Sequence, residues 1–440
     1  MDLASDPLHC GGCGNVCGDE GTERRCVSGS CEFAGCRSGY RDCDGNVANG
    51  CESKRTCLPN QNCDLTGCTG FGSGTVAFTG QIAPRFTRVL TPCEGLRCAV
   101  EAPHFGPGSR VVLHQSRGIP GSQGAWELAT VKALHGTQPP YELELEAPLA
   151  RQYAGGAQVA EVLQFGSVEV AAGQTVSLHP SQFLGTITGG VLALEVSGDL
   201  VVRNNGRISL DGAGFIGGRS TTTCDTGDPG DGNDSGGSGG TGVCSGGGGG
   251  ANAFEGGTGT VDEVGCRAAA GSGGTANVIG TGAAALGFAP AGGGGGQSGG
   301  CNSACGGQGG RGGGVVLLFA RRIVVDPGGR ISANGTSASP TSSSRGGGGG
   351  GAGGSVVLVA REIVLAGSEA LPAVTVSGGT GASCQDRGST AAAAGGDGGA
   401  GLIVLRADTI DGSLSGTFGR VTAMCRVADL LATSVQDRCP

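Results

Sequence analysis

The chain is poor in aromatic residues, charged residues and histidine. Of its 440 residues, 4% are aromatic and 15% are charged, and lysine occurs only at Lys54 and Lys132. The net charge of −9, with no basic stripe, argues against a nucleic-acid partner. No apolar run reaches about 18 residues, so the sequence predicts no membrane span.

Sequence motifs for catalysis are also missing. The chain has no His-Glu-x-x-His, no P-loop and no Gly-x-Ser-x-Gly elbow in a strand-to-helix context. The histidines fall in no recognised nucleophile or metal motif: His9, His104, His114, His135 and His179. The sequence therefore predicts a protein that is not an enzyme and that needs no organic cofactor.

Glycine is the abundant residue, with 96 of 440 positions, and apolar residues make up 38%. A mean hydropathy of +0.03 is compatible with a packed core rather than a charged disordered chain. Strict Gly-X-Y periodicity is absent, which excludes collagen.

Cysteine is concentrated at the N-terminus, where 11 of the 21 cysteines fall in the first 68 residues. That density is typical of a disulfide scaffold in an oxidising compartment. Zinc bound through Cys10-x-x-Cys13 and a cytosolic protein with reduced thiols are the weaker alternatives. The disulfide candidates are Cys10, Cys13, Cys17, Cys26, Cys31, Cys36, Cys43, Cys51, Cys57, Cys63, Cys68, Cys93, Cys98, Cys301, Cys305, Cys425 and Cys439.

Residues 1–70 form the expected cysteine-rich module. The stretches DPLHCGGCGNVC (6–17) and GYRDCDGNVANGCE (39–52) resemble DPxHCGxCGxxC and GYxDCDGxxxNGCE modules of secreted and surface proteins of myxobacteria. The resemblance implies an extracellular location and no catalysis. Met1-Asp2 begins no signal peptide, so we expect a fragment or a processed form of a secreted or cell-surface protein.

Residues 71–165 are predicted to be a small all-β, barrel-like module. Short apolar or alternating runs are separated by glycine and proline turns, as in half-buried strands. The runs are 111–113, 126–131, 141–145 and 158–163. The single tryptophan, Trp126, is interpreted as a core residue rather than a sugar-stacking platform.

Residues 166–420 contain a repeat of short β-strands. Val191-Leu192-Ala193-Leu194, Val315-Val316-Leu317-Leu318 and Val356-Val357-Leu358-Val359 each lead to a second apolar run, with a degenerate copy at 402–415. The motif Ala-Arg-x-Ile-Val occurs at 320–324 and again at 360–364. One such unit cannot bury its own apolar face, so the copies should stack as a solenoid or a sandwich.

Glycine-rich excursions separate the copies. They are either flexible linkers or polyproline-II-type helices packed side by side. In packed helices the outward N–H and C=O groups need partners, and only glycine lets neighbouring backbones approach closely enough. We favour packed polyglycine II helices because both ends of each excursion are held at strands.

The repeats and their glycine tracts are similar to bacterial secreted surface proteins with GGGGGGAGGSIxLxA cores. The tracts also resemble polyglycine regions of anaplastic-lymphoma-kinase-type receptors and of phage tail-tip adhesins. These families use the glycine scaffold to present loops or to bind partners, and no functional residue carries over from them. Residues 421–440 are expected to hold a short helix at 427–433, bracketed by Cys425 and Cys439.

Two acidic groups are candidate sites. Asp42, Asp44, Asn46 and Glu52 place oxygen ligands at alternating positions, as in a calcium loop, with a solvated disulfide loop as the alternative. A second cluster is Asp225, Asp228, Asp231 and Asp234, where a solubilising loop is the alternative to acid–base chemistry on glycosides.

The sequence thus favours an all-β, non-enzymatic, secreted or surface scaffold for adhesion, with a polysaccharide or a cell-surface protein as partner. One alternative is a polysaccharide-active β-solenoid enzyme, whose recurring turn residues would be Arg207, Asp211, Arg330 and Asn334. A subunit of an extracellular filament that self-assembles is another.

Overall fold

The computed structural model describes most of the chain from residue 75 to 412 and parts of both ends. The described residues are 3–6, 9–12, 17, 22–36, 63–64, 67–68, 75–117, 122–180, 189–219, 228–232, 235–241, 245–261, 269–277, 287–299, 307–339, 346–368, 370–382, 393–412 and 420–425. They form strands and extended segments with no α-helix, which confirms the all-β class. Nothing among them is a helix long and apolar enough to cross a membrane.

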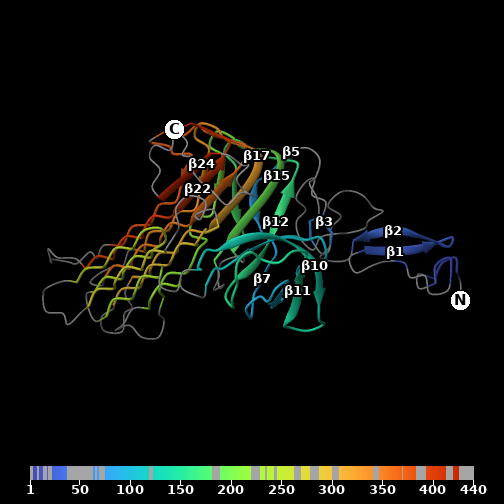
Figure 1. Ribbon diagram of the computed structural model, residues 1–440, viewed down its shortest axis with the longest axis horizontal. Helices are drawn as coiled ribbons and strands as arrows, with labels where there is room; N and C mark the ends of the chain where they lie inside the picture. Colours follow the sequence, from blue (N-terminus) through green and yellow to red (C-terminus); the bar gives the residue numbers. More distant parts are fainter. Residues whose placement is uncertain are drawn as a thin grey trace.

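A 15-stranded sheet is the largest element (Figure 1). Its main path runs through β24 (Arg420–Cys425), β22 (Leu402–Ala407), β19 (Ser355–Val359), β17 (Val315–Val325), β15 (Val191–Val202), β12 (Gln158–Phe165), β9 (Arg110–His114), β10 (Trp126–His135), β11 (Tyr141–Leu145) and β8 (Arg97–Val100). Branches add β13 (Ser167–Val170), β20 (Glu362–Leu365), β23 (Thr409–Gly412), β5 (Thr75–Ala77) and β7 (Phe86–Arg88).

A second, all-parallel sheet of five strands faces it. It contains β21 (Val374–Thr375), β18 (Arg330–Ser332), β16 (Arg207–Ser209), β14 (Thr175–Leu178) and β6 (Gly80–Ile82). The chain passes repeatedly from one sheet to the other, which gives the parallel region the form of a solenoid.

The sequence repeats stack in register, as predicted. Ile323 pairs with Ile363, Val324 with Val364, and Ile208 with Ile331. The two sheets bury opposing ladders of aliphatic side chains between them. One ladder is Val168, Leu200, Ile323 and Ile363, and the other is Val176, Ile208, Ile331 and Val374. Each such side chain contributes roughly 1.5–3 kcal/mol through its burial.

The region 71–165, expected to be a small barrel-like module, is built of antiparallel strands but is not separate from the repeats. Strand β12 pairs antiparallel with β9 and parallel with β15. The second edge of β12 pairs with β7 over residues 158–160 and with β15, the first long strand of the solenoid, over residues 162–165. Val89, just after β7, bridges to Val100 of β8. The antiparallel strands and the repeats consequently share one sheet across the predicted boundary at residue 165.

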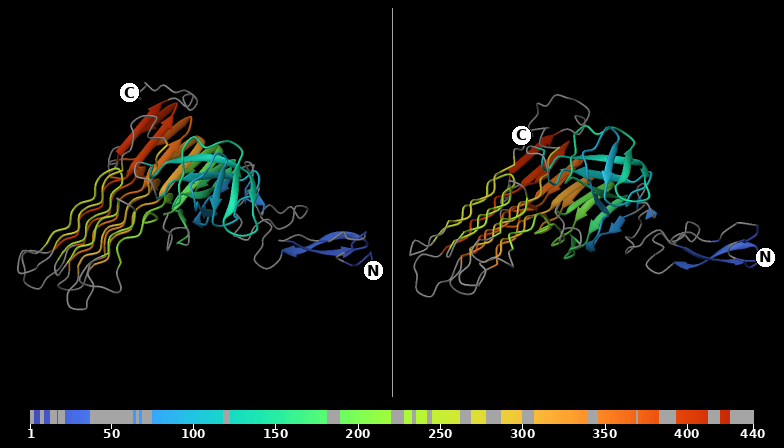
Figure 2. Two further views of the ribbon diagram at one scale, coloured as in Figure 1. Left: turned by 60° about the horizontal axis from the view of Figure 1, so that its bottom comes forward. Right: turned by 90° about the horizontal axis from the view of Figure 1, so that it is seen from below.

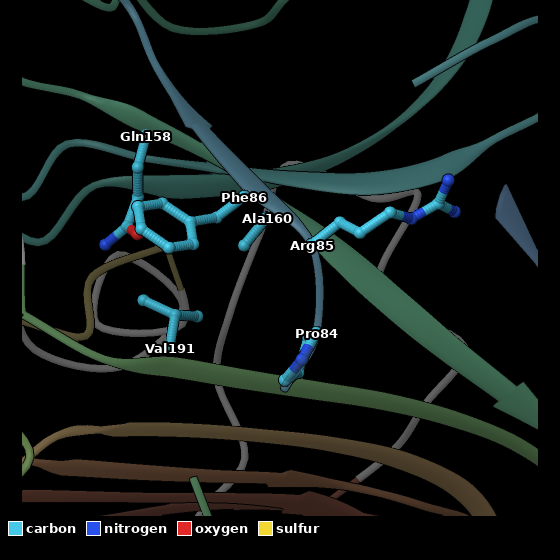
Figure 3. Close-up of a pocket in the computed structure, with 6 residues that line it drawn as sticks. All are labelled: Pro84, Arg85, Phe86, Gln158, Ala160 and Val191. Carbon is cyan, nitrogen blue, oxygen red and sulfur yellow. The ribbon is translucent and has the colours of Figure 1, made fainter. Parts of the chain in front are cut away.

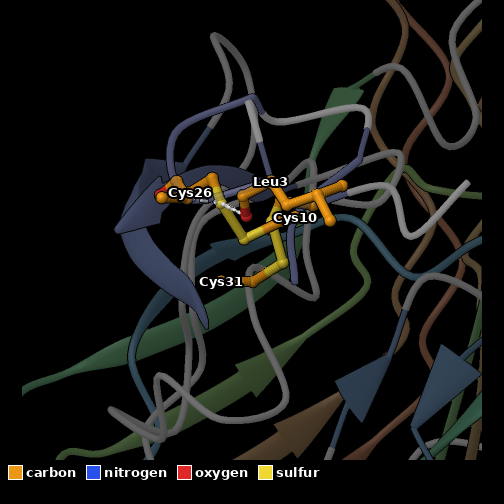
Figure 4. The surroundings of a disulfide bond; sticks show 6 residues. Leu3, Cys10, Cys26 and Cys31 are labelled. Atoms are coloured by element: carbon orange, nitrogen blue, oxygen red, sulfur yellow. Dashed lines mark hydrogen bonds between the residues drawn. A yellow bond between two sulfur atoms is a disulfide. The ribbon is translucent and has the colours of Figure 1, made fainter. Parts of the chain in front are cut away.

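The N-terminal module contributes two small hairpins. They are β1 (Thr22–Val27) with β2 (Ser30–Cys36), and β3 (Cys63–Asp64) with β4 (Gly67–Cys68). Disulfides Cys10–Cys26 and Cys17–Cys31 join the first hairpin to the residues before it, and Figure 4 shows the first of these bonds. A third bond joins Cys93 to Cys98, which lies in β8. The sulfur atoms of Cys10, Cys17 and Cys26 lie within 4.8 Å of one another, but all three are in disulfides and offer no thiolate to zinc.

Candidate functional site: the glycine-rich bundle and its base

Long extended segments from the glycine tracts lie side by side and project from one end of the sheets (Figure 2). Segments distant in sequence alternate in this bundle. Segment 292–299, for example, contacts segments 307–313, 245–251 and 228–231.

The amide groups of segment 292–299 donate to these neighbours in rotation, with N···O distances of 2.7–3.2 Å. Positions 292, 295 and 298 donate to 307–313, positions 293, 296 and 299 to 245–251, and positions 294 and 297 to 228–231. Returning to the same neighbour at every third residue is the pattern of a polyproline-II-type helix, which has three residues per turn. The described tracts are therefore packed helices rather than flexible linkers.

Three inner segments, 246–251, 292–299 and 346–354, each bond to six neighbours. Segment 246–251 donates to three segments through N–H groups and accepts from three others through C=O groups. The surrounding segments form a closed ring in the order 213–218, 228–232, 235–241, 269–277, 254–261, 393–401, 376–382, 333–338 and 307–314, each bonded to the next. This arrangement is a hexagonal lattice of single chains.

Glycine is required in the inner segments because the space beside each Cα is occupied by a neighbouring backbone. A Cβ atom on Gly295 would lie under 3.0 Å from the carbonyl oxygen of Gly349, and one on Gly350 equally close to that of Gly379. Real Cβ atoms essentially never approach so closely. Neither glycine has a positive φ, so the requirement at these positions is for space rather than for backbone conformation.

The base of the bundle is fixed by a buried amide. Asn252 lies at a turn between two glycine segments and is fully buried. The two hydrogens of its Nδ2 are shared among the carbonyl oxygens of Pro290 (3.1 Å), Gly353 (2.7 Å) and Gly354 (2.9 Å). The hydroxyl of Ser355, the first residue of β19, donates to the Pro290 carbonyl at 2.6 Å. These bonds tie three parts of the chain together where the helices meet the sheet.

A buried histidine attaches the antiparallel strands to this base. The Nε2 of His114 is 2.9 Å from the Ala289 carbonyl, and its Nδ1 is 2.8 Å from Oγ of Ser116. Because a carbonyl only accepts, Nε2 carries the hydrogen and Nδ1 accepts from the Ser116 hydroxyl. Gln158 Nε2 donates to the same Ser116 oxygen at 2.7 Å. The Ser–His pair is buried, with no opening to solvent at either residue, and its bonds serve to dock the strands.

Acid is expected to destabilise the protein through this histidine. Burial lowers the pKa of His114 to about 4, whereas an unfolded histidine titrates near 6.5. The unfolded chain therefore binds the proton first, and stability that is complete above pH 6.5 falls progressively as the pH approaches 4. The expected loss is about 3 kcal/mol. Urea unfolding at several pH values measures it, and His114→Gln should flatten the profile over this interval. An equally steep profile in the variant would exclude His114 as the cause.

The second acidic cluster of the sequence analysis is partly described. Asp231 pairs with Arg117, whose guanidinium lies over the ring of Phe215 at 5.5 Å from its centroid. The Asp228 carbonyl accepts from the Gln297 amide at 2.9 Å. Both aspartates thus lie along a bundle segment, while Asp225 and Asp234 are outside the described residues. The calcium candidates Asp42, Asp44, Asn46 and Glu52 are also outside them, as are Cys301, Cys305, Cys439 and the expected helix at 427–433.

The recurring turn residues connect adjacent turns of the solenoid. Asp211 accepts from the backbone N–H of Asn334 at 2.6 Å and from the hydroxyl of Ser332 at 3.1 Å. Asn334 in turn accepts from the N–H of Ser377 at 2.8 Å. Arg207 and Arg330 are paired neighbours on β16 and β18. These positions form a hydrogen-bonded ladder where strands pass into the bundle.

Removing one carboxylate of the ladder should cost stability. Asp211→Ala leaves the Asn334 amide and the Ser332 hydroxyl without this acceptor, and we expect a loss of about 1–3 kcal/mol. Asp211→Asn, which keeps an acceptor oxygen, should recover at least half of that loss. Thermal or urea unfolding of the two variants tests this, and equal losses would show that the oxygen is unimportant.

A hollow beside the junction of β7, β12 and β15 is lined by Pro84, Arg85, Phe86, Gln158, Ala160 and Val191 (Figure 3). It is too narrow to hold a water molecule. Arg85 is held by Glu161 at 2.8 Å. None of its lining residues is a carboxylate, so this hollow has no pair of acids for glycoside chemistry.

Asn252 and His114 were not identified as site residues from the sequence. Asn252 is a single amide between two alanines at the end of a run of glycines, and this isolated polar side chain was a usable signal. His114 had none, because its partner Ala289 is 175 residues away.

Comparisons with known proteins give little. No family model and no curated protein matches the chain. Two phage proteins align with 78% of it: the Gp54 tailspike of Acinetobacter baumannii bacteriophage AP22, solved with A. baumannii capsular saccharide, and the tailspike gp49 from Pseudomonas phage LKA1. Identities are 8% and 9%, the TM-score is 0.17 for both, and the alignments cover 57% and 60% of those chains. The chain thus spans less than two thirds of their length, and a likeness at this score carries no argument.

Proposed function

We propose that the chain is a secreted or cell-surface structural scaffold that holds a rigid surface for contact with polysaccharide or with a cell-surface protein. The observation that carries the proposal is the hexagonal bonding of the inner glycine segments. A linker has no use for six hydrogen-bonded neighbours, and a catalyst needs a cleft rather than a lattice filled by backbone.

Rigidity is the property that this construction provides. The helices begin and end at the edge of a sheet, and Asn252, Ser355 and His114 fix the junction by hydrogen bonds. The three described disulfides support an oxidising, extracellular location. A rigid element loses little conformational entropy on contact, which favours binding of a partner.

A polysaccharide panel tests the function. Purified protein is incubated with cellulose, chitin, peptidoglycan and immobilised acidic polysaccharides, with and without calcium, and with intact bacterial cells. We expect retention on at least one polymer or on cells, with no new reducing ends. New reducing ends would establish the enzyme alternative instead. Absence of retention on every polymer and on cells would overturn the proposal.

A matched pair of variants assigns the retention to the bundle. Gly295→Ala disturbs an inner segment, whereas a Cβ on Gly12 in the N-terminal module meets nothing within 4 Å. Retention should fall at least tenfold with Gly295→Ala and stay unchanged with Gly12→Ala. Equal retention of both would show that another part of the chain makes the contact.

A further inference from the structure

On one side of the ring, two adjacent segments each have a row of backbone groups that make no backbone hydrogen bond within the described residues. In segment 235–241, two of the three rows of backbone groups bond to segments 292–299 and 269–277. The third row, at Gly236 and Gly239, makes no backbone hydrogen bond within the described part of the chain. Both residues are partly exposed.

The neighbouring segment 269–277 also has a row of backbone groups without backbone hydrogen bonds. Its inner row donates to 246–249 at 2.8–2.9 Å. Ala270, Gly273 and Ala276 form its outer row, and neither their N–H nor their C=O groups bond to any other described backbone. The three residues repeat at intervals of three, so they lie on one side of a three-fold helix, about 9 Å apart.

These five residues, Gly236, Gly239, Ala270, Gly273 and Ala276, define what we term the open lattice face. The exposed polar side chains of these two segments are Ser238, Thr241, Ser272 and Thr275, so none is longer than threonine. The other sides of the ring differ, because they present exposed long or charged side chains. Gln308 lies on one of them, and Glu255 and Asp397 on the other. Of these sides of the ring, the open lattice face therefore has the shortest exposed side chains and hinders the approach of a second backbone least.

We propose that the open lattice face is a self-association surface on which a second copy of this chain docks through the same face. Unpaired backbone groups at three-residue intervals are the counterpart of an exposed sheet edge, which pairs with another chain unless it is blocked. A partner must supply donors and acceptors at the same interval and must lack side chains that would hold it away. A second copy meets both conditions and continues the interface that joins segments within the bundle. The inference is independent of the proposed contact with polysaccharide or cells.

The test is the concentration dependence of the oligomeric state. Sedimentation velocity is run on full-length protein, with free thiols alkylated, from 1 to 500 μM. We expect the wild type to shift from monomer to dimer over this range. Thr275→Arg adds a long charged side chain at an exposed position beside Ala276, and it should weaken association at least tenfold. Ser339→Arg, also at an exposed position but next to ring segment 333–338, is the control and should leave association unchanged.

Hydrogen exchange provides the second readout. Amides of residues 236, 239, 270, 273 and 276 should exchange more slowly at high than at low protein concentration. A wild type that stays monomeric throughout would overturn the proposal. So would a dimer that Thr275→Arg leaves intact, or one that both arginine variants weaken equally. The polysaccharide panel is read on monomeric protein, so its result does not depend on this one.

Discussion

Replacing Gly295 by alanine is expected to destabilise the bundle by about 3 kcal/mol or more. The added methyl group would lie under 3.0 Å from the carbonyl oxygen of Gly349. The obstacle is backbone in a lattice, where moving one segment displaces its neighbours. In a helix or loop with free space the same exchange would stabilise by about 0.4–1 kcal/mol, because alanine restricts the unfolded chain. The sign of the effect therefore separates a packed lattice from a flexible linker.

Urea unfolding followed by circular dichroism, together with exchange of the amides in 292–299, measures the effect. Gly12→Ala is the matched control, because nothing lies within 4 Å of its added Cβ and its φ is not positive. It should change stability by less than about 0.5 kcal/mol. A neutral or stabilising Gly295→Ala would mean that the inner segments are not packed as described.

Converting Asn252 to aspartate should cost more than removing its side chain. Asn252→Ala leaves the Gly353 carbonyl without its described partner, at an expected cost of about 2–3 kcal/mol. Asn252→Asp places a carboxylate among three carbonyl oxygens that it cannot bond, and we expect a loss of about 4 kcal/mol at neutral pH.

The aspartate variant also carries a diagnostic pH dependence. Burial among acceptors raises the pKa of a carboxyl above its unfolded value near 3.9. The carboxylate therefore destabilises the folded state at pH values above this raised pKa. As the pH falls through it, the carboxyl gains a proton, becomes a donor, and the destabilisation is relieved. As the pH falls from 7 to 5, the free energy of unfolding of Asn252→Asp should rise relative to that of Asn252→Ala. His114 affects both variants equally, so comparing them cancels its opposing effect. A difference between the two variants that does not change with pH would contradict the donor role assigned to Asn252.

The repeats could be predicted because their signal is local and periodic. Ala320-Arg321 and Ala360-Arg361 mark equivalent places in successive turns of the solenoid, and Ile323 duly pairs with Ile363. Two strands that each have an apolar row every second residue must align those rows, so stacking in register follows from the sequence. The three-residue helices followed from glycine content combined with the positions of the strands.

The sequence could not predict which segments of the bundle are neighbours. One glycine is chemically the same as another, so nothing in the tract 292–296 indicates that it bonds to 307–313 rather than to 376–382. The link between the antiparallel strands and the repeats could not be predicted for a related reason. One edge of β12 pairs with β7 and, further along, with β15, and the sequence of a strand edge does not reveal what will pair with it.

Site prediction was limited by sequence distance. Asp211 and Asn334 were identified from their recurrence at turns, but their bonding to each other is a property of the stacked turns. His114 and Ala289 are in contact although 175 residues separate them in the sequence, and the first segments of the bundle lie within that interval. Such pairs are visible only after the chain has been folded back on itself.

The central claim is that the glycine tracts are hydrogen-bonded helices, and amide hydrogen exchange of the folded protein tests it most directly. Amides in the inner segments 246–251, 292–299 and 346–354 should exchange with protection approaching that of the strands β15 and β17. Amides that face outward on the ring, such as Gln308 and Ser337, should exchange rapidly. Uniformly fast exchange across the inner segments would contradict the account and return these tracts to flexible linkers.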